Sequence, residues 1–317
     1  MKPYFSVLIP VCNQVGKMDE CIGSLKGQTF SDFEVIMVDD GSKDESYAML
    51  EGFAAEDERF HAVKHDGNKS LLAARYTGME NATGEYILFL DSDDHWETNT
   101  LELLHDKLTV TPVDVVRFGF IMEPAGTKCP PVPSDDPVGD YMKDKFPPAI
   151  WKNCYSHRVI EKVLERSESF YCNMGEDACL AGLLFSCADS FDTLDECLYH
   201  YVTGEGMSNS FRNLTLEKLQ RDLKSVEEAG DHLVSFIEKY NPSYSDLAKK
   251  TAGRMKKFVL FQHVYFEEDW DVVMKFLKEF YNERSMDIYD WGCSNVIPAK
   301  IRKIMDPEAP FERFRFD

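Results

Sequence analysis

Positive charge is scarce in this chain. Its 317 residues include 35 Lys and Arg against 56 Asp and Glu, which gives a formal net charge of -21. A negative charge of this size repels polyanions over long distances, so we expect no binding to nucleic acid and no attraction of the whole chain to an anionic membrane. An anionic ligand therefore needs a local cation or a metal ion.

Long apolar runs and paired cysteines are also missing. No apolar stretch is long enough to span a bilayer and none resembles a signal peptide, so we expect a protein that is neither secreted nor integral to a membrane. The nine cysteines are scattered and contain no Cys-x-x-Cys pair, which indicates reduced thiols and a cytoplasmic location. No Gly-x-Gly-x-x-Gly follows the first expected strand, which argues against a dehydrogenase.

The first 91 residues alternate between short β-rich runs and helical patterns. Strands are expected at residues 5–10, 33–38, 60–63 and 85–90, and helices at 17–26, 45–55 and 71–81. This alternation predicts a parallel sheet with right-handed crossovers. Ligands bind at the carboxyl ends of the strands in such sheets.

The remainder of the chain divides into a mixed part and a helical part. We expect a helix at 97–108, a strand at 114–121, a helix at 177–187 and a strand at 197–202. Residues 123–148 carry half of the fourteen prolines, which predicts a long surface loop. Beyond residue 212, apolar residues recur at helical spacing.

Three carboxylates follow the fourth expected strand, at Asp91, Asp93 and Asp94. Residues two apart in an extended chain share a face and lie roughly 6–7 Å apart, so Asp91 and Asp93 can converge on a hard cation such as Mg²⁺ or Mn²⁺. Two other interpretations stay open. Asp93 or Asp94 can cap the helix that follows. Alternatively, Asp91 can be a phosphatase-type nucleophile, with Asp93 as the second Asp two residues on.

A calcium loop does not fit this cluster, because Trp96 occupies the position where its sharp turn requires Gly. A second acidic pair, Asp39 and Asp40, is expected at the same edge of the sheet. Two such clusters repel each other unless positive charge lies between them. A nucleoside diphosphate with its metal ion supplies that charge pattern, and Arg75 is a fixed cation that can pair with the same phosphates or form a surface salt bridge.

Five segments of the chain resemble successive signatures of family 2 inverting glycosyltransferases of the GT-A fold. They are Phe-Ser-Val-Leu-Ile-Pro-Val-Cys-Asn at 5–13, Val-Asp-Asp-Gly-Ser at 38–42, Ala-Arg-Tyr-Thr-Gly at 74–78, Gly-Glu-Tyr at 84–86 and Leu-Asp-Ser-Asp-Asp at 90–94. Their order and spacing match as well. The resemblance is strong over residues 4–97, looser to about residue 211, and absent beyond.

The resemblance implies an α/β fold of GT-A type, with a mostly parallel Rossmann-like sheet flanked by helices and a helical C-terminal segment. It places a catalytic domain at residues 1–211, with a nucleotide-binding half at 1–97 and an acceptor half at 98–211, followed by the helical segment at 212–317.

The resemblance also implies roles for individual residues. Asp39 lies near the nucleotide base, Asp91 near the ribose or the metal ion, Asp93 on the metal ion, and Arg75 toward the diphosphate. The nucleotide-sugar-binding set is completed by Pro10, Val11, Asn13, Asp40 and Ser92.

Asp177, in Gly-Glu-Asp at 175–177, resembles the family's general base. The role has a physical basis, since an acceptor hydroxyl must lose a proton to a nearby carboxylate as it attacks. Helix capping is compatible with it. His200 is assigned to the metal ion, with a packed structural histidine as the alternative. Trp151 is expected either to stack on a sugar or to pack in the core.

The activity implied is a metal-dependent, inverting transfer of a sugar from a nucleoside diphosphate donor, expected to be a UDP-sugar, to a hydroxyl of a glycan or lipid-linked acceptor. The cofactor is Mn²⁺ or Mg²⁺, and the expected context is polysaccharide or glycoconjugate synthesis. The alternative is a catalytically silent nucleotide-sugar-binding or scaffold protein. The loop at 202–206 lacks the arginine that the family often has there.

Near its end the acidic chain becomes locally basic and aromatic, at residues 300–303 and 311–316. This pattern is compatible with peripheral contact at the inner face of a membrane that carries a lipid-linked acceptor. The alternative is a terminal segment that packs on its own domain.

Overall fold

The computed structural model describes residues 2–146, 149–203, 214–267, 269–280 and 286–305. It divides the chain into two compact units, residues 1–206 and 207–317, hereafter unit 1 and unit 2. The domain boundary expected after residue 211 lies among residues 204–213, which are outside the described residues.

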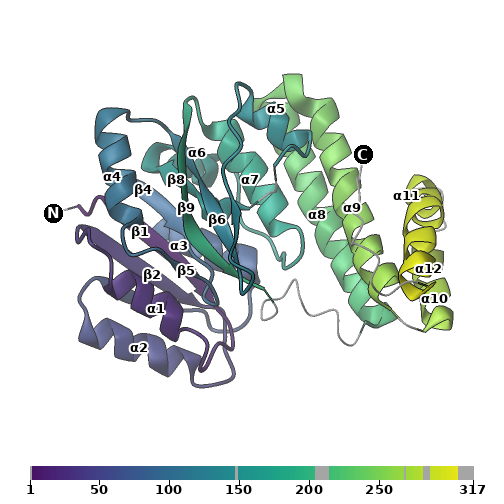
Figure 1. Ribbon diagram of the computed structural model, residues 1–317, viewed down its shortest axis with the longest axis horizontal. Helices are drawn as coiled ribbons and strands as arrows, with labels where there is room; N and C mark the ends of the chain where they lie inside the picture. The colour runs from purple at the N-terminus through teal and green to yellow at the C-terminus, as the bar shows by residue number, and fades with distance from the viewer. Residues whose placement is uncertain (1, 147–148, 204–213, 268, 281–285, 306–317) are drawn as a thin grey trace. The chain divides into compact units, whose positions relative to one another are not determined.

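Unit 1 is built on one sheet, shown in Figure 1. Among the described residues, nine strands form it in the order β3-β2-β1-β4-β8-β6-β9-β5, and β7 pairs with β6. The strands are β1 Phe5–Val11, β2 Phe33–Asp39, β3 Phe60–Lys64, β4 Tyr86–Phe89, β5 His95–Trp96, β6 Val115–Glu123, β7 Thr127–Cys129, β8 Asn153–Ser156 and β9 Phe191–Val202.

The first four strands are parallel, as the alternation of strand and helix patterns predicts. Every residue of β1 is buried, and the strand is apolar except for Ser6 rather than alternating, because it is covered on both faces. Strand β8 runs antiparallel to both β4 and β6. Consequently β6 runs parallel to β4, and their carboxyl ends point to the same edge of the sheet.

Helices cover both faces of the sheet. They are α1 Asp19–Lys26, α2 Ser46–Glu56, α3 Leu71–Asn81, α4 Thr100–Val110, α5 Pro137–Met142, α6 His157–Arg166 and α7 Glu176–Cys187, with a short 3₁₀ turn η1 Ile150–Lys152. Helices α1 and α2 lie together on one side of the strands (Figure 1). Helix α3 packs against α6 and α7 on the other side, as right-handed crossovers require when the strand order reverses between β3 and β4.

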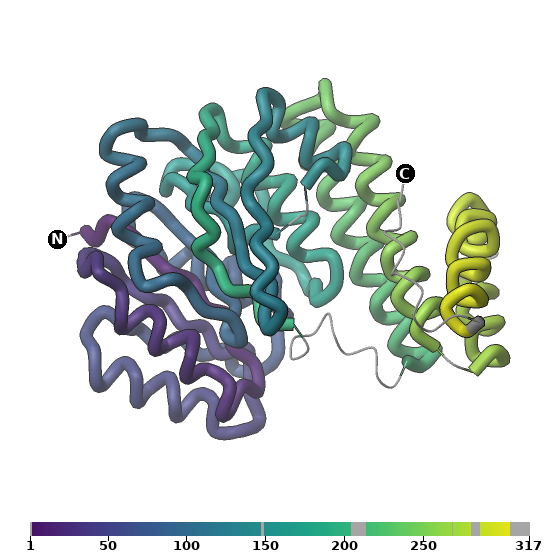
Figure 2. Tube along the Cα trace, viewed as in Figure 1, coloured from purple at the N-terminus to yellow at the C-terminus, as the bar shows by residue number. Residues whose placement is uncertain are grey.

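Three expectations about unit 1 need correction. Residues 123–148 are not one loop: the chain forms β7 opposite β6, and then α5, whose first turn begins with Pro137 and is capped by Asp136. The helix expected from residue 97 begins at Thr100. Strand β9 begins at Phe191 and runs beside β6, far from it in sequence, as Figure 2 shows.

Unit 2 is helical, as its apolar spacing predicts. Its described elements are α8 Leu216–Tyr240, η3 Pro242–Tyr244, α9 Ser245–Phe266, α10 Trp270–Phe280, α11 Met286–Trp291, the π-helical turn η4 Gly292–Val296 and α12 Ile297–Met305. The long helices α8 and α9 pack on each other. In the part of the chain that the structure describes, we find no helix with the length and apolar character to span a membrane.

Candidate functional site

The carboxyl ends of β1, β2 and β4 bring the sequence-predicted residues to one edge of the sheet. Val11 is paired with Asp39 across β1 and β2, and Asp91 follows β4, the other neighbour of β1. Beyond β1 the chain turns through Asn13, which has a φ of 54°. The Asn13 N–H donates to Ser42 Oγ (2.9 Å), and its Oδ1 accepts from the Lys43 N–H (2.8 Å). Pro10, Val11 and Asn13 therefore form one wall with the loop after β2.

Asp39 is fully buried at this edge. Its Oδ2 accepts the Ser42 N–H at 3.2 Å, whereas its Oδ1 is buried without a hydrogen-bond partner in the described part of the chain. A buried carboxylate oxygen without a donor is costly, and proteins rarely leave one in this state. The site therefore suits a ligand that brings an N–H or O–H group to Asp39.

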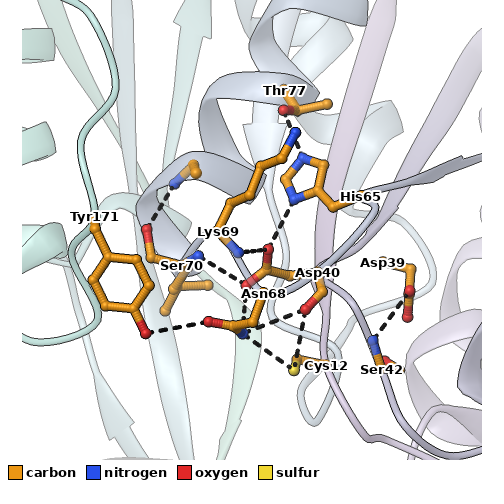
Figure 3. A network of polar contacts seen from close by, with 12 residues as sticks. Cys12, Asp39, Asp40, Ser42, His65, Asn68, Lys69, Ser70, Thr77 and Tyr171 are labelled. Carbon is orange, nitrogen blue, oxygen red and sulfur yellow. Dashed lines mark hydrogen bonds and ion pairs between the residues drawn. The ribbon is translucent and has the colours of Figure 1, made fainter.

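Asp40 has a different environment, shown in Figure 3. Its carboxylate accepts hydrogen bonds from Asn68 Nδ2 (2.8 Å) and from the backbone N–H groups of Lys69 (2.7 Å) and Ser70 (3.0 Å), and it lies 2.8 Å from His65 Nδ1. With four partners inside the chain, Asp40 fixes the loop at residues 65–70.

That loop is joined to a distant segment of the same unit. The Leu71 N–H donates to Asn173 Oδ1 (2.8 Å), and the Tyr171 hydroxyl donates to Asn68 Oδ1 (3.3 Å). Figure 3 shows the Tyr171 hydroxyl directed at Asn68, and Tyr171 is 54% exposed. An exposed aromatic ring beside polar side chains is a surface on which a ring of a ligand can stack. No periodic pattern in the sequence predicts this pairing of residues 68–71 with 171–173.

Arg75 joins the two carboxylates expected to act on donor and acceptor. Its guanidinium is buried, and it donates to Asp91 Oδ1 at 3.1 Å and to Asp177 Oδ1 in a very short contact. Helix α3 carries Arg75 and helix α7 carries Asp177 in its first turn, after Gly175 with a φ of 84°. The Asp177 side chain remains 29% exposed and that of Asp91 25%, so both carboxylates can be reached by a ligand.

The charges around Arg75 shift the pKa values of the acids. Burial raises the pKa of Asp91 to about 6, with Arg75 opposing this and Asp177 and Asp93 adding to it. Burial also raises the pKa of Glu176 to about 8, and the neighbouring Asp177 adds to this. Burial lowers the pKa of Arg75, but Asp177, Asp91 and Glu176 outweigh this effect and raise it. With Glu176 protonated, Asp91 and Asp177 still place two carboxylates on one guanidinium, and this excess of negative charge favours binding of a cation.

The turn after β4 is held by β9. Ser92 is buried, Asp93 is partly exposed, and the Asp94 N–H donates to the Asp91 carbonyl at 3.1 Å. Asp94 does not cap a helix, because α4 begins six residues later, after Asn99. Instead its carboxylate accepts the Tyr199 hydroxyl (2.6 Å) and the Val202 N–H (2.7 Å).

Tyr199 also accepts the Asp91 N–H at 3.3 Å, so it supports both ends of the acidic turn. Burial raises the pKa of Asp94 to about 8, with the charge of Asp91 adding to this. Tyr199 lies in the aromatic strand that the sequence predicts, but its role depends on a pairing across more than a hundred residues, which sequence spacing does not reveal.

The contacts of His200 are those of a packed histidine. Its ring stacks on His95 at 4.4 Å between centroids, and its two ring nitrogens each lie 3.1 Å from a carboxylate, Glu123 and Glu97. Trp151 is likewise packed: it stacks on Tyr199 at 4.3 Å and on Tyr201 at 5.4 Å, and it is 7% exposed. Core packing therefore accounts for Trp151 in this structure.

No group of three or more His, Cys, Asp and Glu side chains within the described residues is arranged to hold a metal ion. The oxygen donors at Asp91 and Asp93 nevertheless fit Mg²⁺ or Mn²⁺, because these ions are commonly held by one or two carboxylates while phosphates and water complete their coordination. The metal site remains a prediction.

Comparison with known proteins identifies a family whose sequence model matches part of the chain. Residues 6–134 match the sequence model of glycosyl transferase family 2. The uncharacterized glycosyltransferase EpsJ of Bacillus subtilis is 31% identical over 214 residues, which is 63% of this chain and 61% of EpsJ. Glycosyltransferase GlyG of Streptococcus pneumoniae is 33% identical over 116 residues, 37% of this chain and 38% of GlyG. The chain thus spans about three fifths or less of the length of these relatives.

The fold is shared with a solved structure. TarS 1-349 of S. aureus, crystallised in complex with UDP-GlcNAc, aligns with a TM-score of 0.61 at 16% identity, covering 98% of this chain and 93% of that one. The expected α/β fold of GT-A type with a helical C-terminal region is confirmed.

Proposed function

Because residues 6–134 match the sequence model of glycosyl transferase family 2, we propose that the chain transfers a sugar from a nucleoside diphosphate donor, a UDP-sugar, to an acceptor hydroxyl with inversion. The observation that carries the proposal is the bridge formed by Arg75. It brings Asp91, at the predicted nucleotide edge, and Asp177, the predicted base, to one guanidinium. Donor and acceptor groups are therefore expected to meet in front of this bridge.

The chain's own groups supply the chemistry of transfer. Arg75 holds Asp177 by its Oδ1, and within the described residues no donor is bonded to Oδ2. Oδ2 takes the proton of the acceptor hydroxyl, whose oxygen forms a bond to the anomeric carbon from the face opposite the diphosphate. The bond from that carbon to the diphosphate oxygen breaks, and the nucleoside diphosphate leaves with the electron pair. A single displacement of this kind inverts the configuration.

On the donor side, Asp39 Oδ1 accepts a hydrogen bond from the base, and the wall formed by Pro10, Val11 and Asn13 borders the nucleotide. Asp91 and Asp93 are the residues that would hold Mg²⁺ or Mn²⁺. Once bound, the ion would neutralise negative charge on the diphosphate. Asp40 contributes indirectly, because its four partners fix the loop at 65–70.

Transfer is tested first with Asp177→Asn. We expect nucleotide binding within about twofold of the wild-type value and a loss of transfer or donor hydrolysis of roughly 10²–10⁴-fold, the size of a general-base contribution. Unchanged turnover in Asp177→Asn would reject the base. A wild-type chain that binds nucleotide sugars but turns none over would support the alternative of a binding or scaffold protein.

The metal ion is tested by calorimetry of UDP with and without chelator. We expect binding to require Mn²⁺ or Mg²⁺ and to weaken at least tenfold in Asp93→Ala. Binding that is indifferent to chelator rejects the metal proposal. A screen of nucleotide sugars for hydrolysis identifies the donor sugar.

We also propose that the C-terminal basic residues touch a membrane that carries a lipid-linked acceptor. Lys300 takes no part, because it is 5% exposed and its ammonium donates to the Tyr265 carbonyl (3.0 Å) and to the Glu267 carbonyl. Ile301 and Ile304 of α12 are exposed. Residues 311–316 lie outside the described residues. Flotation with anionic liposomes, for the full chain and a truncation after residue 305, tests the contact; equal flotation of both rejects it for residues 306–317.

A further inference from the structure

Two cations are buried in unit 1 outside the carboxylate cluster. Arg117, the third residue of β6, is 2% exposed, and Lys152, the last residue of η1, is 6% exposed. Arg117 is paired with Asn153, the residue that follows Lys152, and its charge adds to the effect of burial in lowering the pKa of Lys152. Within the described residues neither cation forms an ion pair.

The internal contacts of these cations leave polar atoms unpartnered. Arg117 Nη1 donates to the Val132 carbonyl at 2.8 Å, and its guanidinium lies 3.7 Å from the centre of the Phe146 ring, but its Nε is buried without an acceptor among the described residues. Lys152 Nζ lies 5.8 Å from the Phe120 ring centre and donates no hydrogen bond to any described residue. Asn153, which pairs with Arg117 across the strands, has an unpartnered Oδ1.

This arrangement is costly, since a buried charge without a partner loses its hydration and gains little in return. Burial, with Arg117 adding to it, lowers the pKa of Lys152 to about 7, and burial lowers the pKa of Arg117 to about 10. Acids are abundant in a chain with a net charge of -21. Besides Tyr155, the acid whose charge acts on Arg117 is the carboxylate of Asp140, which is bound to Lys145 (2.7 Å) and Ser134 (2.8 Å).

The pair lies on the side of the site where the acceptor is expected. The registers of β8 with β4 and with β6 place Arg117 level with Phe89, two residues before Asp91. The charges of Asp177 and Arg117 both act on the hydroxyl of Tyr155. Asp177 and Arg117 are therefore both within electrostatic reach of the Tyr155 hydroxyl, which places Arg117 toward the region of the predicted base.

We propose that Arg117 and Lys152 form a subsite for an oxyanion of the acceptor, either a phosphate ester or a sugar carboxylate. The identification of the ligand as the acceptor rests on the proposed function. The existence of an oxyanion site rests only on the two buried cations. Arg117 Nε and the Lys152 ammonium supply charge-assisted hydrogen bonds, and Asn153 Oδ1 accepts one hydroxyl of the same ligand. Lys152 keeps 6% of its surface exposed, so the pair is not sealed from solvent.

The test measures binding of inorganic phosphate and of glucuronate to the full chain by calorimetry, without UDP and at saturating UDP. We expect at least one anion to bind, and UDP to leave its affinity within about twofold. Preference for one anion separates phosphate-ester from carboxylate acceptors. Competition by UDP assigns the cations to the donor diphosphate and overturns the proposal, as does the failure of both anions to bind.

Lys152→Met is the decisive variant, with Lys300→Met as the matched control. Lys300 is equally buried but has two carbonyl acceptors. We expect Lys152→Met to weaken anion binding about tenfold or more and to raise the melting temperature of the ligand-free chain, because an unpaired buried charge is removed. Lys300→Met should lower the melting temperature and leave anion binding unchanged. Anion binding of wild-type strength in Lys152→Met overturns the subsite.

The two proposals fail separately. If UDP does not bind but phosphate or glucuronate binds in a Lys152-dependent manner, the proposed donor function is wrong and the oxyanion site stands. If UDP binds and sugar transfer occurs while Lys152→Met changes no anion affinity, the transferase assignment stands and the subsite is rejected.

Discussion

At the scale of single residues, the unpartnered oxygen of Asp39 gives a direct prediction. Asp39→Asn exchanges an acceptor for an amide donor at a fully buried position. We expect UDP binding, measured by calorimetry, to weaken at least tenfold, because a buried donor on the base then faces another donor. The exposed Asp32→Asn is the control. Equal affinities in both variants would show that Asp39 does not contact the nucleotide.

Glu176 gives a pH-dependent prediction. Its pKa is raised from an ordinary 4.5 to about 8 in the folded chain, by burial and by Asp177. The folded state therefore holds a proton that the unfolded state releases, so this contribution to stability is complete below about pH 4.5 and is lost as the pH rises through 8. Glu176→Gln is neutral at every pH. We expect it to match the wild type near pH 5 and to exceed its free energy of unfolding by roughly 1–3 kcal/mol near pH 9.

The measurement is urea denaturation of both proteins at several pH values, with the exposed Glu165→Gln as control. A difference between Glu176→Gln and wild type that does not change with pH contradicts the raised pKa. Retained turnover in this variant, beside its loss in Asp177→Asn, would also assign the base to Asp177 rather than to its neighbour.

At the scale of elements, the hydrogen bonds of Asp40 hold the conformation of the loop between β3 and α3. Asp40→Ala leaves the N–H groups of Lys69 and Ser70 and the Asn68 amide without their acceptor. We expect a loss of roughly 2–4 kcal/mol in the free energy of unfolding, since buried donors keep their desolvation cost. Hydrogen exchange should accelerate at the Lys69 and Ser70 amides. Asp66→Ala, at an exposed position of the same loop, should change neither quantity.

Periodicity identifies the elements whose burial is regular. The alternation of strand and helix patterns predicts β1 to β4 and α1 to α3, because β1, β2 and β4 are covered on both faces and α1 and α2 each bury one stripe. The same signals fail at residues 123–148. Prolines there favour a loop, but Pro137 occupies the first turn of α5, where its missing N–H costs nothing.

In the candidate site, too, local sequence patterns predict only some of the contacts. The edge of the sheet predicts that Asp39, Asp40 and Asp91 lie near one another, since parallel strands end together. It does not reveal their partners. Arg75 lies 102 residues from Asp177 in sequence, and Asp94 binds Tyr199 rather than a helix end. Such contacts depend on how β9 and α7 return to the first half of unit 1, which local pattern does not encode.

At the scale of the whole molecule, the net charge of -21 makes every local cation informative. Arg75 forms ion pairs with two carboxylates of its own unit, Asp91 and Asp177, so its charge is balanced within the site even though its Nε has no hydrogen-bond partner among the described residues. Arg117 and Lys152 are the contrasting case within the described residues, because no carboxylate pairs with them. Arg117 and Lys152 would thus neutralise the negative charge of an anionic acceptor. The negative charge of the donor diphosphate would be neutralised by the proposed metal ion.

The division into two units gives the last prediction. All of the residues proposed to bind donor, metal and acceptor lie in unit 1, which has its own sheet and core. A chain cut after residue 206 is expected to fold and to bind UDP with an affinity within about threefold of the full chain, because no proposed nucleotide contact is removed. Calorimetric unfolding should show one transition for the truncated chain and a further contribution from unit 2 in the full chain, since separate domains need not unfold together. Loss of UDP binding on truncation, in a fragment that still melts cooperatively, would mean that unit 2 completes the nucleotide site.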